Sequence, residues 1–82
     1  MLERQIVEER LTAVFRDAFD DDRITLHDHT TADDIEEWDS LSHISLVLSV
    51  EKEFGLRLSA AEVGALGNVG EMIDLIVARA SR

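Results

Sequence analysis

Ser40 and His43, one helical turn apart, are the residues of this chain most suited to covalent chemistry. In that spacing a serine hydroxyl can serve as a nucleophile and the imidazole as its general base. A working pair also needs an acid that orients the histidine, an oxyanion hole and a cleft. A chain of 82 residues has little room for such a cleft. Helical periodicity turns His43 toward the apolar side of its segment, so we interpret it as a partly buried structural residue and expect no catalytic residue.

Two groups of side chains suggest metal ligands without completing a site. His27 and His29 flank Asp28, but no cysteine or third ligand accompanies them to make a tetrahedral zinc site. The aspartates at 20–22 suggest a calcium loop, yet Ile24 stands where an oxygen ligand should be and no glycine follows. We therefore expect solvated histidines, at most loose divalent binding at the aspartates, and no dedicated metal site.

The composition limits the classes of function. Eighteen acidic residues against eight basic ones give a net charge of −10, which argues against nucleic acid and favours partners with basic patches. The chain has no cysteine, so any thiol must be added after synthesis. No stretch approaches the roughly 20 apolar residues of a membrane span. We expect a single domain over residues 1–82, monomeric and cytoplasmic.

The stretch from Trp38 to Phe54 predicts the central helix. Asp39 and Ser40 are both good N-cap residues, and Gly55 stands where a left-handed C-cap glycine is expected. The residues predicted to face the core are Leu46, Val47, Val50 and Phe54. Those predicted to point elsewhere are Leu41, Ile44 and Leu48, alongside Ser45 and Lys52. This helix is therefore apolar over more of its surface than one core contact requires.

Helical periodicity also predicts the elements on either side. A helix from Leu2 to about Phe19 has the apolar stripe Val7, Leu11, Val14, Phe15 and Ala18, widened by Ile6 and Phe19. The long connection that follows is anchored by Ile24, Leu26 and Ile35, and the ring of Trp38 packs on the domain. A capping box at Ser59 and Glu62 opens a short helix to Leu66. Asn68 and Glu71 repeat that signature before a last helix with the stripe Val69, Met72, Ile73, Ile76, Val77 and Ala80. The predicted fold is all-α, a small bundle of three main helices and one short helix.

Asp39-Ser40-Leu41 at the start of an apolar helix, in a small acidic chain, resembles the acyl carrier proteins and related peptidyl carrier domains. The resemblance covers nearly the whole chain. It implies that Ser40 bears a phosphopantetheine arm through a phosphodiester, and that the arm's thiol holds an acyl group as a thioester. It also implies that Asp39 and Leu41 help a phosphopantetheinyl transferase to recognise Ser40. The arm or its cargo would rest on the domain or enter a gap between the second and third helices, with Leu48 and Val63 at the entrance.

A simpler interpretation is that Ser40 only caps its helix. Asp39 could cap equally well, however, and free N–H groups at a helix N-terminus favour a phosphodiester. Ser45, Lys52 and Trp38 depart from the pattern of fatty-acid carriers, which favours a specialised lipid, polyketide or related pathway. Two alternatives stay open. One is a peptidyl or aminoacyl carrier of a nonribosomal-type pathway. The other is an unmodified interaction domain that docks through Leu41, Ile44 and Leu48.

Overall fold

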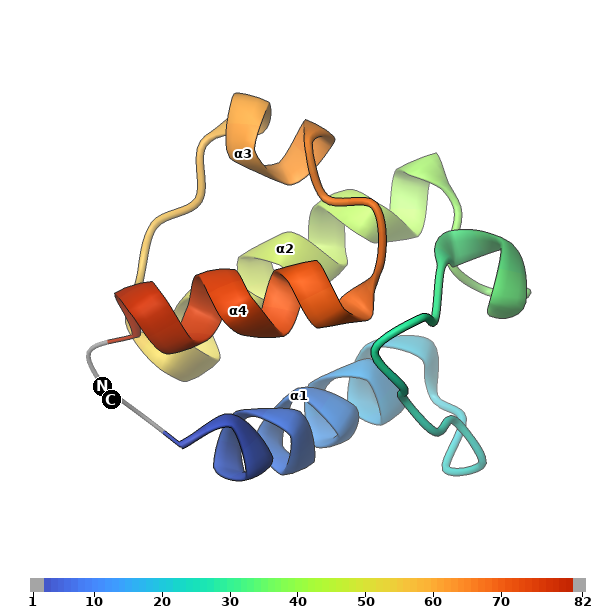
Figure 1. The fold of residues 1–82 in the computed structure, drawn as a ribbon. Coiled ribbons are helices and arrows are strands. Elements are labelled where there is room, and N and C mark those ends of the chain that lie inside the picture. The colour runs from blue at the N-terminus through green and yellow to red at the C-terminus, as the bar shows by residue number, and fades with distance from the viewer. Residues whose placement is uncertain (1–2, 81–82) are drawn as a thin grey trace.

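The computed structural model describes residues 3–80, apart from the side chains of residues 40 and 60, and four α-helices and one 3₁₀ turn lie within this range. The helices are α1 (Arg4–Phe19), α2 (Ser40–Phe54), α3 (Ala60–Gly64) and α4 (Val69–Arg79), and the turn is η1 (Ala32–Asp34) (Figure 1). No strand occurs in the described range. The prediction of an all-α fold with three main helices and one short helix is confirmed.

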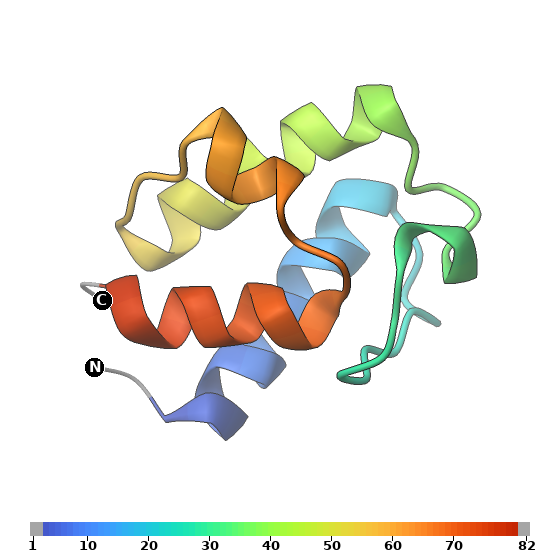
Figure 2. The same ribbon diagram turned by 45° about the horizontal axis from the view of Figure 1, so that its top comes forward.

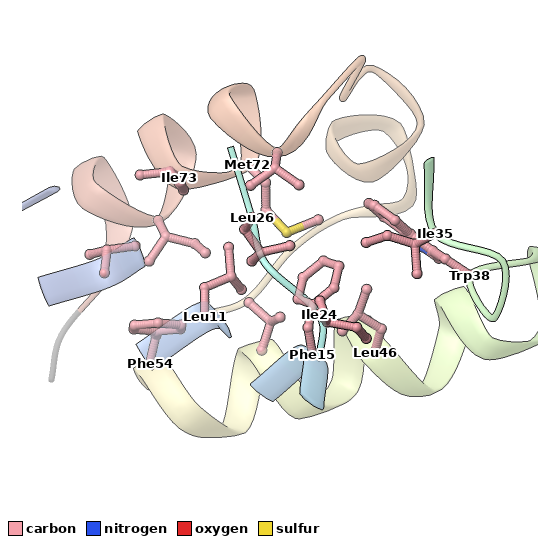
Figure 3. Packing of buried hydrophobic residues seen from close by; sticks show 14 of the residues in the cluster. Leu11, Phe15, Ile24, Leu26, Ile35, Trp38, Leu46, Phe54, Met72 and Ile73 are labelled. Carbon is pink, nitrogen blue, oxygen red and sulfur yellow. The ribbon is translucent and has the colours of Figure 1, made fainter. Parts of the chain in front are cut away.

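The three longer helices bury one apolar face each. α1 packs against both α2 and α4, and the connection between α1 and α2 wraps one end of the bundle (Figures 1 and 2). The completely buried residues of the core, several of them in Figure 3, are Val7, Leu11, Phe15, Leu46, Val50, Phe54, Val69, Ile73 and Ile76. All of them belong to the predicted apolar stripes. The periodicity therefore identified the core correctly.

The edges of the stripes differ from the prediction. On α1, Ala18 is exposed and Ile6 keeps 41% of its surface accessible, because the two partners of this helix cover a narrower band than the apolar residues occupy. Leu2 lies outside the described residues, and the helix begins at Arg4. α3 ends at Gly64, two residues before the predicted end at Leu66.

Buried side chains and backbone hydrogen bonds hold the connection from residue 20 to residue 39 against the helices. Ile24, Leu26 and Ile35 are buried, as predicted. The carbonyl of Thr30 accepts the N–H of Val69 at 2.8 Å, and the carbonyl of Asp28 accepts the N–H of Gly70 at 2.9 Å. A Cβ at Gly70 would lie only 2.9 Å from that Asp28 oxygen, so the close approach requires glycine. The connection is thereby fixed to the first turn of α4.

Ion pairs join the remaining elements. Arg10 of α1 donates to the Glu53 carboxylate and to its carbonyl, both at 2.8 Å, with its guanidinium 4.5 Å from the centre of the Phe54 ring. Arg79 of α4 pairs with Glu62 of α3, whose carboxylate also accepts the N–H of Ser59 in the predicted capping box. Within residues 3–80, no helix is both long and apolar enough to cross a bilayer.

Candidate functional site

Asp39 is the N-cap of α2, which makes Ser40 the first residue of the helix. The Asp39 carboxylate accepts the N–H groups of Leu41 at 3.0 Å and Ser42 at 2.9 Å. In return, the Asp39 N–H donates to the Ser42 hydroxyl at 2.9 Å, and that hydroxyl donates to the Glu37 carbonyl at 2.8 Å. Of the two possible caps in the sequence, the structure uses Asp39. The cap and the segment before it are therefore held by hydrogen bonds of Asp39, Ser42 and Glu37.

These hydrogen bonds favour the charged form of Asp39. The N–H of Ser42 has the largest effect in lowering the pKa of the Asp39 carboxyl, partial desolvation opposes it, and the N–H of Leu41 lowers it further. The residue beside Ser40 is therefore a carboxylate at neutral pH. This carboxylate also lies at the positive end of the α2 dipole, where negative charge is stabilised.

The same geometry corrects the expectation of free N–H groups at this helix end. The N–H groups of Leu41 and Ser42 bind Asp39, and that of His43 binds the Asp39 carbonyl at 2.9 Å. An anion attached at Ser40 would therefore gain from the helix dipole but not from these three donors. It would also be repelled by the adjacent carboxylate, so the site fits a phosphodiester that extends into solvent.

Trp38 and His43 connect the chain before Ser40 to the chain after it. The indole Nε1–H of Trp38 donates to His43 Nδ1 at 2.9 Å, and the two rings stack with centroids 5.9 Å apart. The indole also meets the Phe15 ring edge-on, with ring centroids 5.0 Å apart. Trp38 is 9% exposed and His43 is partly buried, as predicted for both. We call this contact the Trp38–His43 pair; it fixes the junction between the loop and α2.

The outward face of α2 is apolar next to this junction. Leu41, Ile44 and Leu48 retain 80%, 62% and 61% of their accessible surface, respectively. Ser45 and Lys52 are exposed on the same helix. The sequence prediction that these side chains point away from the core is confirmed. We refer to Leu41, Ile44 and Leu48 as the outward patch.

A cavity of about 540 Å³ opens beside the start of α2. Its walls come from the η1 turn, the first turn of α2 with the residues before it, α3, and the segment that leads into α4. The lining residues are Thr31, Ala32, Asp33, Trp38, Asp39, His43, Val63, Leu66, Gly67, Asn68 and Met72. Val63, which was predicted to line an entrance between the second and third helices, lines this cavity. Leu48 does not line this cavity and belongs to the outward patch instead.

Most of the lining residues carry no sequence signal that would have assigned them to one site. Thr31 and Asp33 come from one connection and Leu66 and Asn68 from another, and the two pairs share neither a motif nor a period. Several lining residues stand close to the recognisable motif or to a predicted helix boundary, but nothing in the sequence indicates that these boundaries meet. The cavity is thus a product of tertiary packing.

The described structure brings together the two histidines considered as metal ligands, but without a third ligand. His27 and His29 are both exposed, and their rings stack with centroids 5.5 Å apart. Across the described residues, no group of three histidine, aspartate or glutamate side chains is arranged to hold a metal ion.

Comparison with known proteins identifies the family. Residues 9–76 match the family described as a phosphopantetheine attachment site. The protein belongs to this family of phosphopantetheine-binding carriers. A solved structure agrees, the solution NMR structure of a holo acyl carrier protein from Geobacter metallireducens, which is 41% identical in sequence with a TM-score of 0.84. The match covers 89% of this chain and 84% of that one. A comparison with curated proteins gives no significant match.

Family membership determines the general role of the chain. It is an acyl carrier protein, a non-catalytic protein whose cofactor is phosphopantetheine. Such a carrier interacts with a phosphopantetheinyl transferase and with acyl-processing enzymes. The predicted cofactor and the predicted absence of an enzymatic activity agree with this assignment.

Proposed function

We propose that Ser40 is the attachment residue and that this carrier presents an acyl or aminoacyl thioester to the enzymes of a specialised pathway. The observation that carries the proposal is the division of roles at the start of α2. Asp39 caps the helix, so Ser40 stands at its first position without being needed as the cap. Because the chain contains no cysteine, the thiol that holds the cargo is that of the phosphopantetheine group.

The other described serines have structural roles or lie within helices. The Ser42 hydroxyl binds Glu37 and Asp39, and the Ser59 hydroxyl caps α3. Ser45 and Ser49 lie in the middle of α2, away from any helix terminus. Ser40 alone of these five follows the N-cap directly, where the dipole favours an anion.

The surface around Ser40 supports a role for its neighbours in recognition. Leu41 follows Ser40 directly and is the most exposed member of the outward patch. Asp39 precedes Ser40 directly and carries a charged carboxylate. We infer that the transferase recognises both. The net charge of −10 supports docking on basic patches of partner enzymes. Ser45 and Lys52 place a neutral and a basic side chain on the exposed side of α2, which supports dedicated partners over those of general fatty-acid synthesis.

Intact mass spectrometry tests the attachment. The chain is incubated with coenzyme A and a broad-specificity phosphopantetheinyl transferase, and we expect the wild type to gain one phosphopantetheine group. Ser40→Ala should gain none while keeping its helical circular dichroism. The matched control is Ser45→Ala, which lies further along the same helix and should be modified like the wild type.

Two results would contradict the proposal. Modification of Ser40→Ala would move the attachment to another residue. A wild-type chain that gains no mass under conditions that modify another carrier would favour an unmodified domain that docks through the outward patch.

A further inference from the structure

The side chain of Trp38 holds the segment from residue 36 to residue 39 against the core. The other residues of this segment are exposed, whereas Trp38 is buried and its indole meets the Phe15 ring of α1 edge-on (Figure 3). A buried indole N–H needs an acceptor, and His43 Nδ1 supplies it at 2.9 Å. Trp38 stands two residues before Ser40, so this hydrogen bond helps to fix the chain that leads to the serine.

The direction of the hydrogen bond requires a neutral histidine. An indole N–H can only donate, so His43 Nδ1 must present its lone pair, and the hydrogen of the imidazole lies on Nε2. In the protonated ring both nitrogens carry hydrogens, and the Nδ1–H would oppose the indole N–H. Protonation of His43 therefore removes the acceptor of Trp38. Histidine is the side chain that ordinarily changes charge between about pH 5 and pH 8.

The groups around His43 offer its protonated ring a different partner. The cavity that His43 lines is also lined by Asp33 of η1 and by Asp39 at the start of α2. The described lining residues from α3, from α4 and from the segment between them are uncharged, and the pair contacts α1 through Phe15. An imidazolium that turns away from Trp38 is attracted by these two carboxylates. Protonation thus favours a different position of the ring.

From this geometry we propose that His43 is a positioning residue for the transfer of phosphopantetheine to Ser40, and that it acts through Trp38 and only in its neutral form. The inference rests on the proposed attachment at Ser40. In the transfer, the serine oxygen forms a bond to the phosphorus that carries the pantetheine, the bond from that phosphorus to the adenosine bisphosphate of coenzyme A breaks, and the hydroxyl proton is released to water. His43 takes no part in these steps and holds the chain before Ser40 through Trp38.

NMR of the unmodified chain tests the hydrogen bond. The chain has a single tryptophan, so one indole N–H signal reports on it. We expect this signal to shift between about pH 8 and pH 5 in the wild type. His43→Asn should hold the signal constant, because the asparagine oxygen lies as many bonds from the backbone as Nδ1 and accepts a hydrogen bond without changing charge. His29→Asn is the matched control, since His29 is exposed and does not line the cavity, and it should shift like the wild type.

The rate of transfer tests the positioning. We measure kcat/KM with coenzyme A and a broad-specificity transferase for the wild type and for His43→Asn, and take their ratio at each pH, which cancels the pH dependence of the transferase itself. The ratio should fall about fivefold between about pH 8 and pH 5, which is one hydrogen bond of about 1 kcal/mol at about 1.36 kcal/mol per factor of ten. Since the pKa of the Asp39 carboxyl is lowered, the cap stays ionised over this interval and does not contribute.

Two further variants make the rate measurement specific to the pair. Trp38→Phe has no indole N–H to lose, so its kcat/KM should keep a constant ratio to that of His43→Asn at every pH. His29→Asn should keep a constant ratio to the wild type. Helical circular dichroism at each pH verifies that every chain in the comparison is folded.

The inference is overturned if the wild-type indole signal does not move with pH, or if the ratio of wild type to His43→Asn is constant. It is also overturned if His29→Asn removes the pH dependence as His43→Asn does. In these cases the attachment stands wherever intact mass shows that the wild type is modified and Ser40→Ala is not. A chain that is not modified at Ser40 contradicts the attachment, and the positioning role with it, whereas the NMR result on the hydrogen bond does not depend on the attachment.

Discussion

A double-mutant cycle on the Trp38–His43 pair measures how strongly this contact holds the segment around Ser40. Trp38→Phe removes the indole N–H and keeps an aromatic ring toward Phe15. His43→Leu removes the acceptor and keeps an apolar side chain at a partly buried helical position. The double variant removes both partners. The assay is urea denaturation followed by helical circular dichroism, with unfolding free energies extrapolated to water.

The expected coupling free energy between Trp38 and His43 follows from the burial and the hydrogen bond of the pair. In His43→Leu, the nearly buried Trp38 N–H loses the acceptor that it reaches at 2.9 Å, and an unsatisfied buried donor costs about 1 to 3 kcal/mol. In Trp38→Phe, the histidine nitrogen can turn to water because His43 is only partly buried, so the loss is mainly the smaller ring. The double variant leaves no unsatisfied donor. We therefore expect a coupling free energy of about 1 kcal/mol, out of a total stability of about 4 to 12 kcal/mol.

A matched control and a functional measurement complete this test. His29→Leu makes the same change on an exposed loop and should shift stability by less than about 0.5 kcal/mol. Both variants of the pair should also lower kcat/KM for phosphopantetheinyl transfer, because the junction before Ser40 is less well fixed. Additivity of the two single variants within about 0.3 to 0.5 kcal/mol would refute the reasoning, since it would mean that the two side chains do not stabilise each other.

Three further predictions concern stability. Gly70→Ala should destabilise the chain by about 1 to 2 kcal/mol, since its Cβ would meet the Asp28 carbonyl oxygen at 2.9 Å. The control Gly64→Ala has open space for its Cβ and should stabilise the chain by about 0.4 to 1 kcal/mol. Equal melting temperatures of the two variants would contradict the contact between Gly70 and Asp28. Asp39 has a lowered pKa, so its stabilising effect is complete above the ordinary aspartate pKa of about 3.9 and is lost as the pH falls through the lower folded value. Asp39→Asn should therefore melt below the wild type at neutral pH and approach it in acid, and a constant difference across the titration would argue against an ionised cap. The crowded carboxylates at 20–22 and 33–39 predict that added salt or divalent cations raise the melting temperature, which a salt-independent transition would disprove.

The sequence was sufficient for the helices and their faces. The positions of Leu46, Val50 and Phe54 in the core, and of Leu41 and Ile44 outside it, follow from a period of 3.6 residues alone. The periodicity does not determine how wide a stripe is covered, because that depends on the angle and distance of the partner helices. Ile6 and Ala18 fit the period of the α1 stripe and were therefore assigned to the core face, but the partner helices do not cover them and both are exposed.

The choice of cap could not be made from residue preferences. Asp39 and Ser40 are nearly equivalent as N-caps, and the outcome depends on the contacts of neighbouring residues. The Ser42 hydroxyl accepts the N–H of Asp39 and donates to the Glu37 carbonyl, and both bonds hold Asp39 at the cap position. The cavity was equally beyond prediction, because its walls come from segments far apart in the sequence.

The arrangement of Trp38, Asp39 and Ser40 has a physical reason in the proposed chemistry. A serine that capped α2 would lose its hydroxyl hydrogen bond whenever it was modified, and loss of a cap costs about 0.5 to 2 kcal/mol. That penalty would be a large part of the stability of so small a domain, and it would make the fold depend on the loading state of the carrier. Here Asp39 binds the helix N–H groups and Trp38 fixes the preceding chain through His43. The attachment proposed at Ser40 therefore removes none of the hydrogen bonds described at this junction, and the same surface can be presented to the transferase and to the enzymes that follow it.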